Sequence, residues 1–106
     1  MSKKQLKLGA FFYLPSGHHF ASWRYPASEP ERAYDLEYLV ELAKIAEQGK
    51  FDTIFFADGF GEELLEYSPS GLRIDPLIIQ SALAAVTKHI GLVATVTTTY
   101  NEPFQL

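Results

Sequence analysis

The chain contains three short apolar runs, and two longer stretches with helical periodicity separate them. The runs cover Lys7 to Leu14, Thr53 to Ala57 and Leu92 to Thr99. The first lacks a clear alternation of polar and apolar residues, and the third is rich in β-branched residues, which favour strands. Apolar runs of this kind are typical of strands that are buried on both faces, as in a parallel sheet. The pattern therefore predicts three strands.

The stretch between the first two runs predicts a helix that begins at Asp35 and ends at Gly49. The Asp35 carboxylate is placed to cap free N–H groups, and Gly49 can take the left-handed conformation that closes a helix. Between them, apolar residues recur at helical spacing and form one stripe, which consists of Leu36, Leu39, Val40, Ala43 and Ala46.

A second helix is predicted to open at Asp75-Pro76, because Asp is a strong capping residue and Pro is favoured at the first helical position. Gly91 is expected to stop this helix, with His89 near its end. The apolar or small residues at helical spacing are Leu77, Ile78, Ser81, Ala82, Ala85 and Val86.

The elements follow the order strand, helix, strand, helix, strand, and both crossovers are long enough for parallel pairing. This order is typical of an α/β fold, either barrel-like or doubly wound. A closed barrel of this type needs eight βα units and about 250 residues, whereas this chain supplies two complete units and a third strand. No linker interrupts the sequence, so we expect residues 1–106 to form a single, partial domain that is truncated after its third strand.

Composition narrows the classes of function. The formal net charge is −4 and no basic stripe is present, so there is no electrostatic reason to bind nucleic acid or an anionic membrane. The absence of cysteine excludes disulfides, thiolate metal sites and a Cys nucleophile. No run approaches the roughly 20 apolar residues of a membrane span. We therefore expect a soluble, cytoplasmic protein with no nucleic-acid or membrane partner.

Residues at the predicted strand ends are candidates for ligand contacts. In parallel α/β folds, ligands gather beyond the carboxyl ends of the strands, and Asp58 lies there on the second strand. Its carboxylate could accept hydrogen bonds from a ring N–H or a hydroxyl, although Asp58-Gly59 is equally consistent with a simple turn. On the third strand, alternation places Thr95, Thr97 and Thr99 on one face, and we expect one threonine of this run to bind a ligand.

A long loop from Ser16 to about Ala33 follows the first strand, and loops of such length are usually functional. It contains His18 and His19, but adjacent histidines point in different directions and no third ligand is close in sequence, so no metal site is predicted. Trp23-Arg24 could clamp a planar anionic ligand or anchor the loop to the rim of the fold, and we favour the anchor.

Four motifs share their order and spacing with one known family. They are Gly17-His18-His19 with Ser22-Trp23-Arg24-Tyr25-Pro26, then Phe55-Phe56-Ala57-Asp58-Gly59, then Ser81 to Thr87, and finally Ile90 to Thr95 with Thr98-Thr99-Tyr100-Asn101-Glu102-Pro103. Together they resemble the nitrilotriacetate monooxygenase component A group of the luciferase-like flavin-dependent monooxygenase superfamily. The resemblance covers essentially the whole chain.

This resemblance implies that residues 1–106 are the N-terminal portion of a (β/α)8 TIM barrel that oxygenates a small organic substrate with O2. It also implies FMN in its reduced form, a separate flavin reductase that supplies it, and association into homo-oligomers. By position, it makes Asp58 and Thr95 flavin contacts and Thr97 a weaker candidate, and it assigns no catalytic residue. The remaining flavin contacts of the family, including its phosphate site, come from later strands, so we expect little activity from these residues alone.

Two other interpretations stay open. One is a non-catalytic half-barrel that is inactive alone or self-associates, because the run from Leu92 to Thr99 would leave an unpaired sheet edge. The other is a small doubly wound domain that binds a phosphorylated ligand, and it is weaker because the sequence has no Gly-rich phosphate loop.

Overall fold

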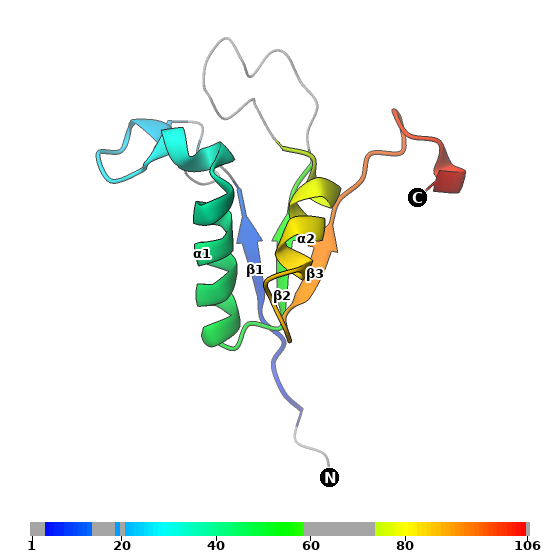
Figure 1. The fold of residues 1–106 in the computed structure, drawn as a ribbon, viewed down its shortest axis with the longest axis horizontal. Coiled ribbons are helices and arrows are strands. Elements are labelled where there is room, and N and C mark those ends of the chain that lie inside the picture. The colour runs from blue at the N-terminus through cyan, green and yellow to red at the C-terminus, as the bar shows by residue number, and fades with distance from the viewer. Residues whose placement is uncertain (1–3, 14–18, 20, 59–73, 106) are drawn as a thin grey trace.

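A computed structural model of the chain describes residues 4–13, 19, 21–58 and 74–105 (Figure 1). Strands and α-helices alternate in the order β1 (Gly9–Phe12), α1 (Leu36–Gln48), β2 (Thr53–Phe56), α2 (Pro76–Ala84) and β3 (Gly91–Ala94). Short 3-10 helices are η1 (Ser22–Arg24), η2 (Pro30–Tyr34) and η5 (Pro103–Gln105). The predicted order of strands and helices is therefore confirmed.

The strands form one parallel sheet in the order β1-β2-β3, and both α-helices lie against the same face of it (Figure 1). One hydrophobic core holds these two layers together. Its buried members are Leu39, Ala43, Ala46, Ile54, Phe56, Ile79, Leu83 and Ile90. The members from α1 belong to the stripe that the sequence predicts, whereas Leu36 in the first turn is 52% exposed.

The opposite face of the sheet is uncovered in the described part of the chain. Phe11, Phe55 and Val93 are paired across the three strands on this face. The side chains of Phe11 and Val93 are 49% and 42% exposed, and the rings of Phe11 and Phe55 are 5.0 Å apart. We call these three residues the open face.

A row of small residues lies at the start of the sheet. Gly9 and Gly91 flank Thr53 in register. A Cβ atom on Gly9 would lie 2.9 Å from Thr53 Oγ1, and one on Gly91 would lie 3.0 Å from Thr53 Cγ2. Both distances are shorter than ordinary van der Waals contacts. The two glycines therefore leave the space that the branched Thr53 side chain fills.

The amino edge of the sheet is tied together through Asp52. Its carboxylate accepts hydrogen bonds from the backbone N–H of Leu8 at 2.9 Å and from Lys7 Nζ at 3.0 Å. These interactions lower the pKa of Asp52, mainly through the Leu8 N–H and then through Lys7. The Asp52 carbonyl accepts the N–H of Gly91 at 2.7 Å, so one residue holds the starts of all three strands.

A second tether joins the end of α1 to the segment that precedes β3. Glu47 Oε1 accepts the backbone N–H groups of Lys88, His89 and Ile90 at 2.8, 2.6 and 3.1 Å. These three donors stabilise the carboxylate, with the His89 N–H as the largest contribution, and lower the pKa of Glu47 to about 2. The sequence predicted His89 near the end of a helix. In the structure it lies instead in a loop that this tether fixes.

Both predicted helix starts are confirmed, and α1 ends beside Gly49 as predicted, but Gly49 does not take the predicted left-handed conformation. Asp35 accepts the N–H of Glu37 at 2.9 Å, and Asp75 accepts two N–H groups of α2 at 2.7 and 3.4 Å. At the end of α1, Gly49 has a φ of −71°, and the left-handed residue is Lys50 with a φ of 61°. Gly49 still donates a helical hydrogen bond to Ile45, so the chain enters the left-handed conformation one residue later, at Lys50.

The buried face of α2 also differs from the predicted one. Leu77 and Ile78 are 47% and 65% exposed, while Ile79, Gln80 and Leu83 face the core. Seven of the nine residues in the α2 segment PLIIQSALA are apolar, so periodicity alone did not identify the side that packs on the sheet. The helix ends at Ala84, well before Gly91, and the last turn is closed by Thr87 Oγ1, which donates to the Leu83 carbonyl at 2.8 Å.

All three strands are shorter than their apolar runs. β3 ends at Ala94 and residues 98–100 form a turn, so strand alternation does not govern Thr95 or the threonines that follow it. Residues 59–73, between β2 and α2, lie outside the described residues. In the part of the chain that the structure describes, no helix has the length and apolarity needed to cross a membrane.

Candidate functional site

The segments that leave β2 and β3 meet at the carboxyl edge of the sheet. Thr97 Oγ1 donates a hydrogen bond to Asp58 Oδ2 at 2.8 Å, and both side chains are half-buried. Two of the residues that the sequence marks as ligand contacts are thus in direct contact. The bond also shows that the Asp58 side chain does more than shape the turn after β2.

Thr95 lies directly after β3 and is half-buried, but it does not take part in the Asp58–Thr97 hydrogen bond. Thr98 and Thr99 are exposed on the turn beyond it. Asn101 Nδ2 donates to the Thr97 carbonyl at 2.8 Å and so fixes the backbone of this segment. Among the threonines of this segment, Thr97 is therefore the one with a described hydrogen bond to Asp58.

Hydrogen-bond chemistry limits what this pair can offer a ligand. A hydroxyl has one donor hydrogen, and that of Thr97 is directed at Asp58. Thr97 is therefore left with acceptor capacity, and an ionised Asp58 carboxylate only accepts. The pair fits a ligand that presents N–H or O–H donors, and its negative charge does not fit a phosphate group.

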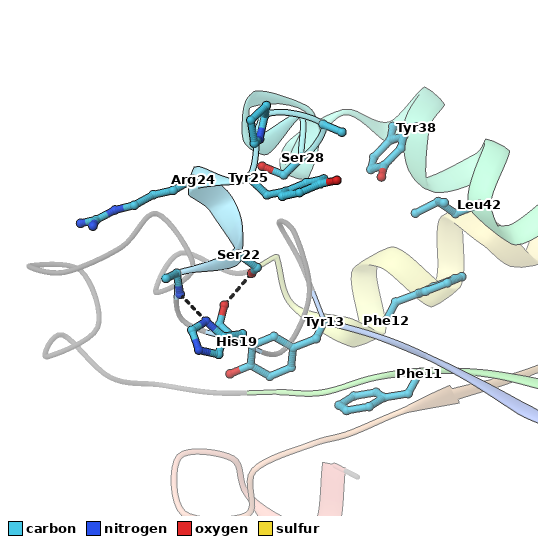
Figure 2. Close-up of a pocket in the computed structure, with 13 residues that line it drawn as sticks. Phe11, Phe12, Tyr13, His19, Ser22, Arg24, Tyr25, Ser28, Tyr38 and Leu42 are labelled. Carbon is cyan, nitrogen blue, oxygen red and sulfur yellow. Dashed lines mark hydrogen bonds between the residues drawn. The ribbon is translucent and has the colours of Figure 1, made fainter.

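A cavity of about 890 Å³ opens beside this edge, at the end of β1 (Figure 2). Its walls come from the end of β1, from α1, and from residues 19, 21, 22 and 24–28 of the first loop. The side chains that matter below are Phe12, Tyr13, His19, Tyr25, Tyr38 and Leu42. Asp58 and Thr97 do not line it, so the cavity and the Asp58–Thr97 pair are separate features of the described residues.

The first-loop residues are placed mainly by contacts within the loop. The backbone N–H of Ala21 donates to His19 Nδ1 at 3.1 Å, and Ser22 donates to the His19 carbonyl through its N–H at 2.8 Å and its hydroxyl at 2.5 Å (Figure 2). His18 lies outside the described residues. No three His, Cys, Asp or Glu side chains of the described ranges gather in a geometry that could hold a metal ion.

The contacts described for Trp23 and Arg24 lie within the first loop, so the choice between a ligand clamp and an anchor to the rim stays a prediction. The Arg24 guanidinium lies 5.0 Å from the centre of the Trp23 ring, and the Arg24 side chain extends away from the cavity (Figure 2). The Trp23 carbonyl accepts the Ser28 hydroxyl at 2.9 Å. The pair therefore stabilises the local turn.

Sequence inspection missed the cavity walls and one buried amide. Tyr38 and Leu42 are four residues apart on α1, a spacing that places them on one side of the helix, but they lie off the core stripe. Gln80 is 6% exposed, and its Nε2 donates to the carbonyls of Val93 at 2.9 Å and Ile54 at 3.3 Å. A polar residue amid the apolar segment of α2 was the available signal for this bridge between β2 and β3.

Comparison with known proteins places these features in a family. The family described as luciferase-like monooxygenase matches residues 16–106. The chain is 46% identical over 104 residues to N-acetyl-S-(2-succino)cysteine monooxygenase of Bacillus subtilis (strain 168), which covers 98% of this chain and 23% of that protein. It is 41% identical over 118 residues to nitrilotriacetate monooxygenase component A of Aminobacter aminovorans, covering 99% of this chain and 26% of that protein.

Solved structures show the same relationship. The long-chain alkane monooxygenase LadA superposes with a TM-score of 0.82 at 35% identity, over 97% of this chain and 26% of that one. DmoA from Hyphomicrobium sulfonivorans superposes with a TM-score of 0.77 at 32% identity, over 96% of this chain and 24% of that one. The three-stranded sheet with its two helices therefore corresponds to part of a TIM barrel. The chain spans about a quarter of the length of the relatives that it matches.

Proposed function

The chain belongs to the luciferase-like monooxygenase family, and we propose that it forms the first part of a barrel that oxygenates a small organic molecule with O2 and reduced FMN. Reduced FMN supplies two electrons when bound, so that one oxygen atom enters the substrate and the other leaves as water. The observation that carries the proposal is the Asp58–Thr97 hydrogen bond at the carboxyl edge of β2 and β3, since barrel enzymes bind their ligands at this edge.

Each proposed flavin contact has a defined chemical role. Asp58 accepts hydrogen bonds from N–H or hydroxyl groups of the flavin, and Thr97 holds the carboxylate in place from its other side. Thr95, half-buried where the chain leaves β3, contributes its hydroxyl at the same edge. The flavin phosphate is expected to bind elsewhere in the barrel, because the Asp58–Thr97 pair offers acceptors and negative charge.

The proposed reaction needs a supply of reduced flavin from a second protein. One relative is named as component A of its monooxygenase, which supports a system of at least two components. We propose a flavin reductase as the partner. The relatives named above differ in their substrates, so we propose only a small organic molecule as the substrate.

The chain corresponds to about a quarter of its relatives, and the proposed turnover is assigned to the complete barrel. We expect residues 1–106 alone to oxygenate little or no substrate when FMN and a reductase are supplied. Their expected contribution is a weak flavin-binding surface at the carboxyl edge.

An anaerobic titration with reduced FMN tests the proposed function. Asp58→Ala should weaken flavin binding by about tenfold or more, because it removes a charged hydrogen-bond acceptor. Thr98→Val is the matched control, since Thr98 is exposed on the same segment and should leave the dissociation constant unchanged. Equal binding by the unmodified chain and Asp58→Ala would contradict the assignment.

The open face supports a second candidate, a half-barrel that associates with copies of itself. Phe11 and Val93 are 49% and 42% exposed on the open face, and exposed apolar patches favour association. Sedimentation velocity measures the association state, and a thermal unfolding curve measures the cooperativity of unfolding. A chain that is monomeric at micromolar concentration and unfolds cooperatively would argue against this candidate.

A further inference from the structure

The cavity shown in Figure 2 passes around the carboxyl end of β1. Phe11 lies on the open face of the sheet, whereas the next residue, Phe12, packs toward the core under the helices, and both line the cavity. Tyr38 and Leu42 of α1 form its far wall. The cavity therefore reaches from the carboxyl end of β1 into the layer between the first loop and α1.

The end of the cavity at α1 is apolar and aromatic. Figure 2 shows Tyr38 and Leu42 side by side on α1, with the Tyr25 ring near Tyr38 and the Phe12 ring across from them. Aromatic rings and a leucine side chain favour aryl, alkyl and thioether groups through apolar contact, ring stacking and sulfur–aromatic contact. This end therefore selects for the apolar part of a molecule.

The other end of the cavity carries polar groups. His19 and Tyr13 lie together there in Figure 2, close to the carboxyl edge of the sheet. Because His19 Nδ1 accepts the Ala21 N–H, the neutral ring carries its proton on Nε2. The imidazole and the Tyr13 hydroxyl give this end of the cavity its polar character.

Permanent charge is nearly absent from the described cavity lining. Arg24 is its one permanently charged residue, and its guanidinium lies over Trp23 and points away from the cavity. Among the described lining residues, a ligand with several carboxylates or a phosphate would find no balancing cation other than Arg24, and such desolvation is costly. The cavity therefore favours a neutral group.

The wall at α1 is held in place before any ligand arrives. The Arg32 guanidinium lies 4.5 Å from the centre of the Tyr38 ring, and it forms ion pairs with Asp35 at 3.4 Å and Glu41 at 3.3 Å. A third ion pair joins Arg32 to Glu29 at 3.4 Å. One arginine thus fixes the Tyr38 ring against the segment that carries the rest of the wall, which lowers the cost of ordering on binding.

We propose that this cavity binds a neutral aryl or alkyl group, thioethers included, of the organic substrate, and that the polar remainder of the molecule is directed to the carboxyl edge beside His19 and Tyr13. That the bound molecule is the substrate of the enzyme rests on the proposed function. That the cavity binds a neutral group does not depend on the proposed function. A cavity of about 890 Å³ is within the size range of small-molecule sites.

Methyl phenyl sulfide is a suitable neutral probe, and 4-(methylsulfanyl)benzoate is its anionic counterpart. Chemical-shift changes in NMR spectra of the protein locate each probe and give its dissociation constant. Leu42→Trp fills the apolar end of the cavity, and Ile45→Trp is the matched control because Ile45 is 64% exposed on the same helix and does not line the cavity. Reduced FMN is titrated into the same samples under anaerobic conditions.

The neutral probe should shift resonances of Tyr25, Tyr38 and Leu42, and Leu42→Trp should weaken its binding about tenfold while Ile45→Trp leaves it unchanged. The anionic probe should bind at least about fivefold more weakly than the neutral one. Shifts confined to the open face, equal binding by Leu42→Trp, no binding of the neutral probe, or equal binding of the two probes would each overturn the inference. Loss of flavin binding in Asp58→Ala with the probe retained supports both proposals, whereas flavin binding that is insensitive to Asp58→Ala overturns the proposed function alone.

Discussion

At the scale of single residues, the Asp58–Thr97 hydrogen bond organises the carboxyl edge. It joins residues 39 positions apart in the chain through a 2.8 Å contact. The sequence indicated each residue separately, Asp58 by its place after a strand and Thr97 as one of several threonines. It could not pair them, because their contact depends on how the chain leaves two different strands. The structure singles out Thr97 because it alone of the threonine run reaches Asp58 among the contacts described.

Thr97→Val should weaken binding of reduced FMN by about three- to tenfold, because the nearly isosteric side chain no longer holds the Asp58 carboxylate. Thr97→Ser retains the hydroxyl and should restore most of the affinity. The dissociation constants come from the same anaerobic titration, with Thr98→Val as the control. A Thr97→Ser variant that binds as weakly as Thr97→Val would assign the effect to packing and not to the hydrogen bond.

Gly9→Ala should destabilise the fold by about 1–3 kcal/mol, because the new methyl group would lie 2.9 Å from Thr53 Oγ1. A double-mutant cycle with Thr53→Ala isolates the clash, since removing the branched side chain frees the space. Denaturant unfolding of the two single variants and the double variant gives the coupling free energy between the two positions. If the losses in the free energy of unfolding are strictly additive, the strands move apart to accept the methyl group.

At the scale of the elements, caps and strand order followed from the sequence, while the buried face of α2 did not. Asp35 and Asp75 cap their helices through local hydrogen bonds, which a short window of sequence encodes. The orientation of α2 depends on Gln80, whose amide bridges the carbonyls of β2 and β3, and on a sheet that lies far away in sequence. The contact of Glu47 with residues 88–90 is equally non-local.

The Glu47 tether predicts a specific dependence of stability on pH. The pKa of Glu47 is lowered from 4.5 to about 2 in the folded chain. The contribution of its carboxylate to the free energy of unfolding is therefore fully present above about pH 4.5 and is lost as the pH falls toward about 2. Glu47→Gln keeps an acceptor oxygen but cannot titrate. The free energy of unfolding of this variant should therefore fall less steeply than that of the unmodified chain between pH 4.5 and about 2.

Urea unfolding at several pH values in this window measures the difference. Glu102→Gln serves as the control, because the Glu102 side chain is exposed near the end of the chain. Parallel pH profiles for the unmodified chain and Glu47→Gln would mean that the three N–H donors do not stabilise the carboxylate in solution.

At the scale of the whole molecule, the sheet is covered by helices on one side only. The open face matches a position in the family's barrel where further strands and side chains would pack, and the chain spans about a quarter of its relatives. The α/β order and the family motifs were sufficient to predict this partial barrel. The cavity was beyond sequence reasoning, because it forms between a loop, a strand end and a helix face.

Residues 1–106 on their own should self-associate through the open face at micromolar concentration. The double variant Phe11→Lys with Val93→Lys should shift the distribution toward monomer, because it places two charges on the exposed patch. Ile45→Lys changes an exposed apolar residue on the helix side and serves as the control. Sedimentation velocity measures the distribution, and no difference between the double variant and the control would place association on another surface.

The most direct test of the account is to map reduced FMN on the isotopically labelled protein by NMR under anaerobic conditions. We predict shifts at Asp58, Thr95 and Thr97, at the carboxyl edge of β2 and β3, with little change at Asp52 on the amino edge. Shifts that cluster around Asp52, or a flavin that leaves the carboxyl edge unperturbed at saturating concentration, would contradict the proposed flavin site.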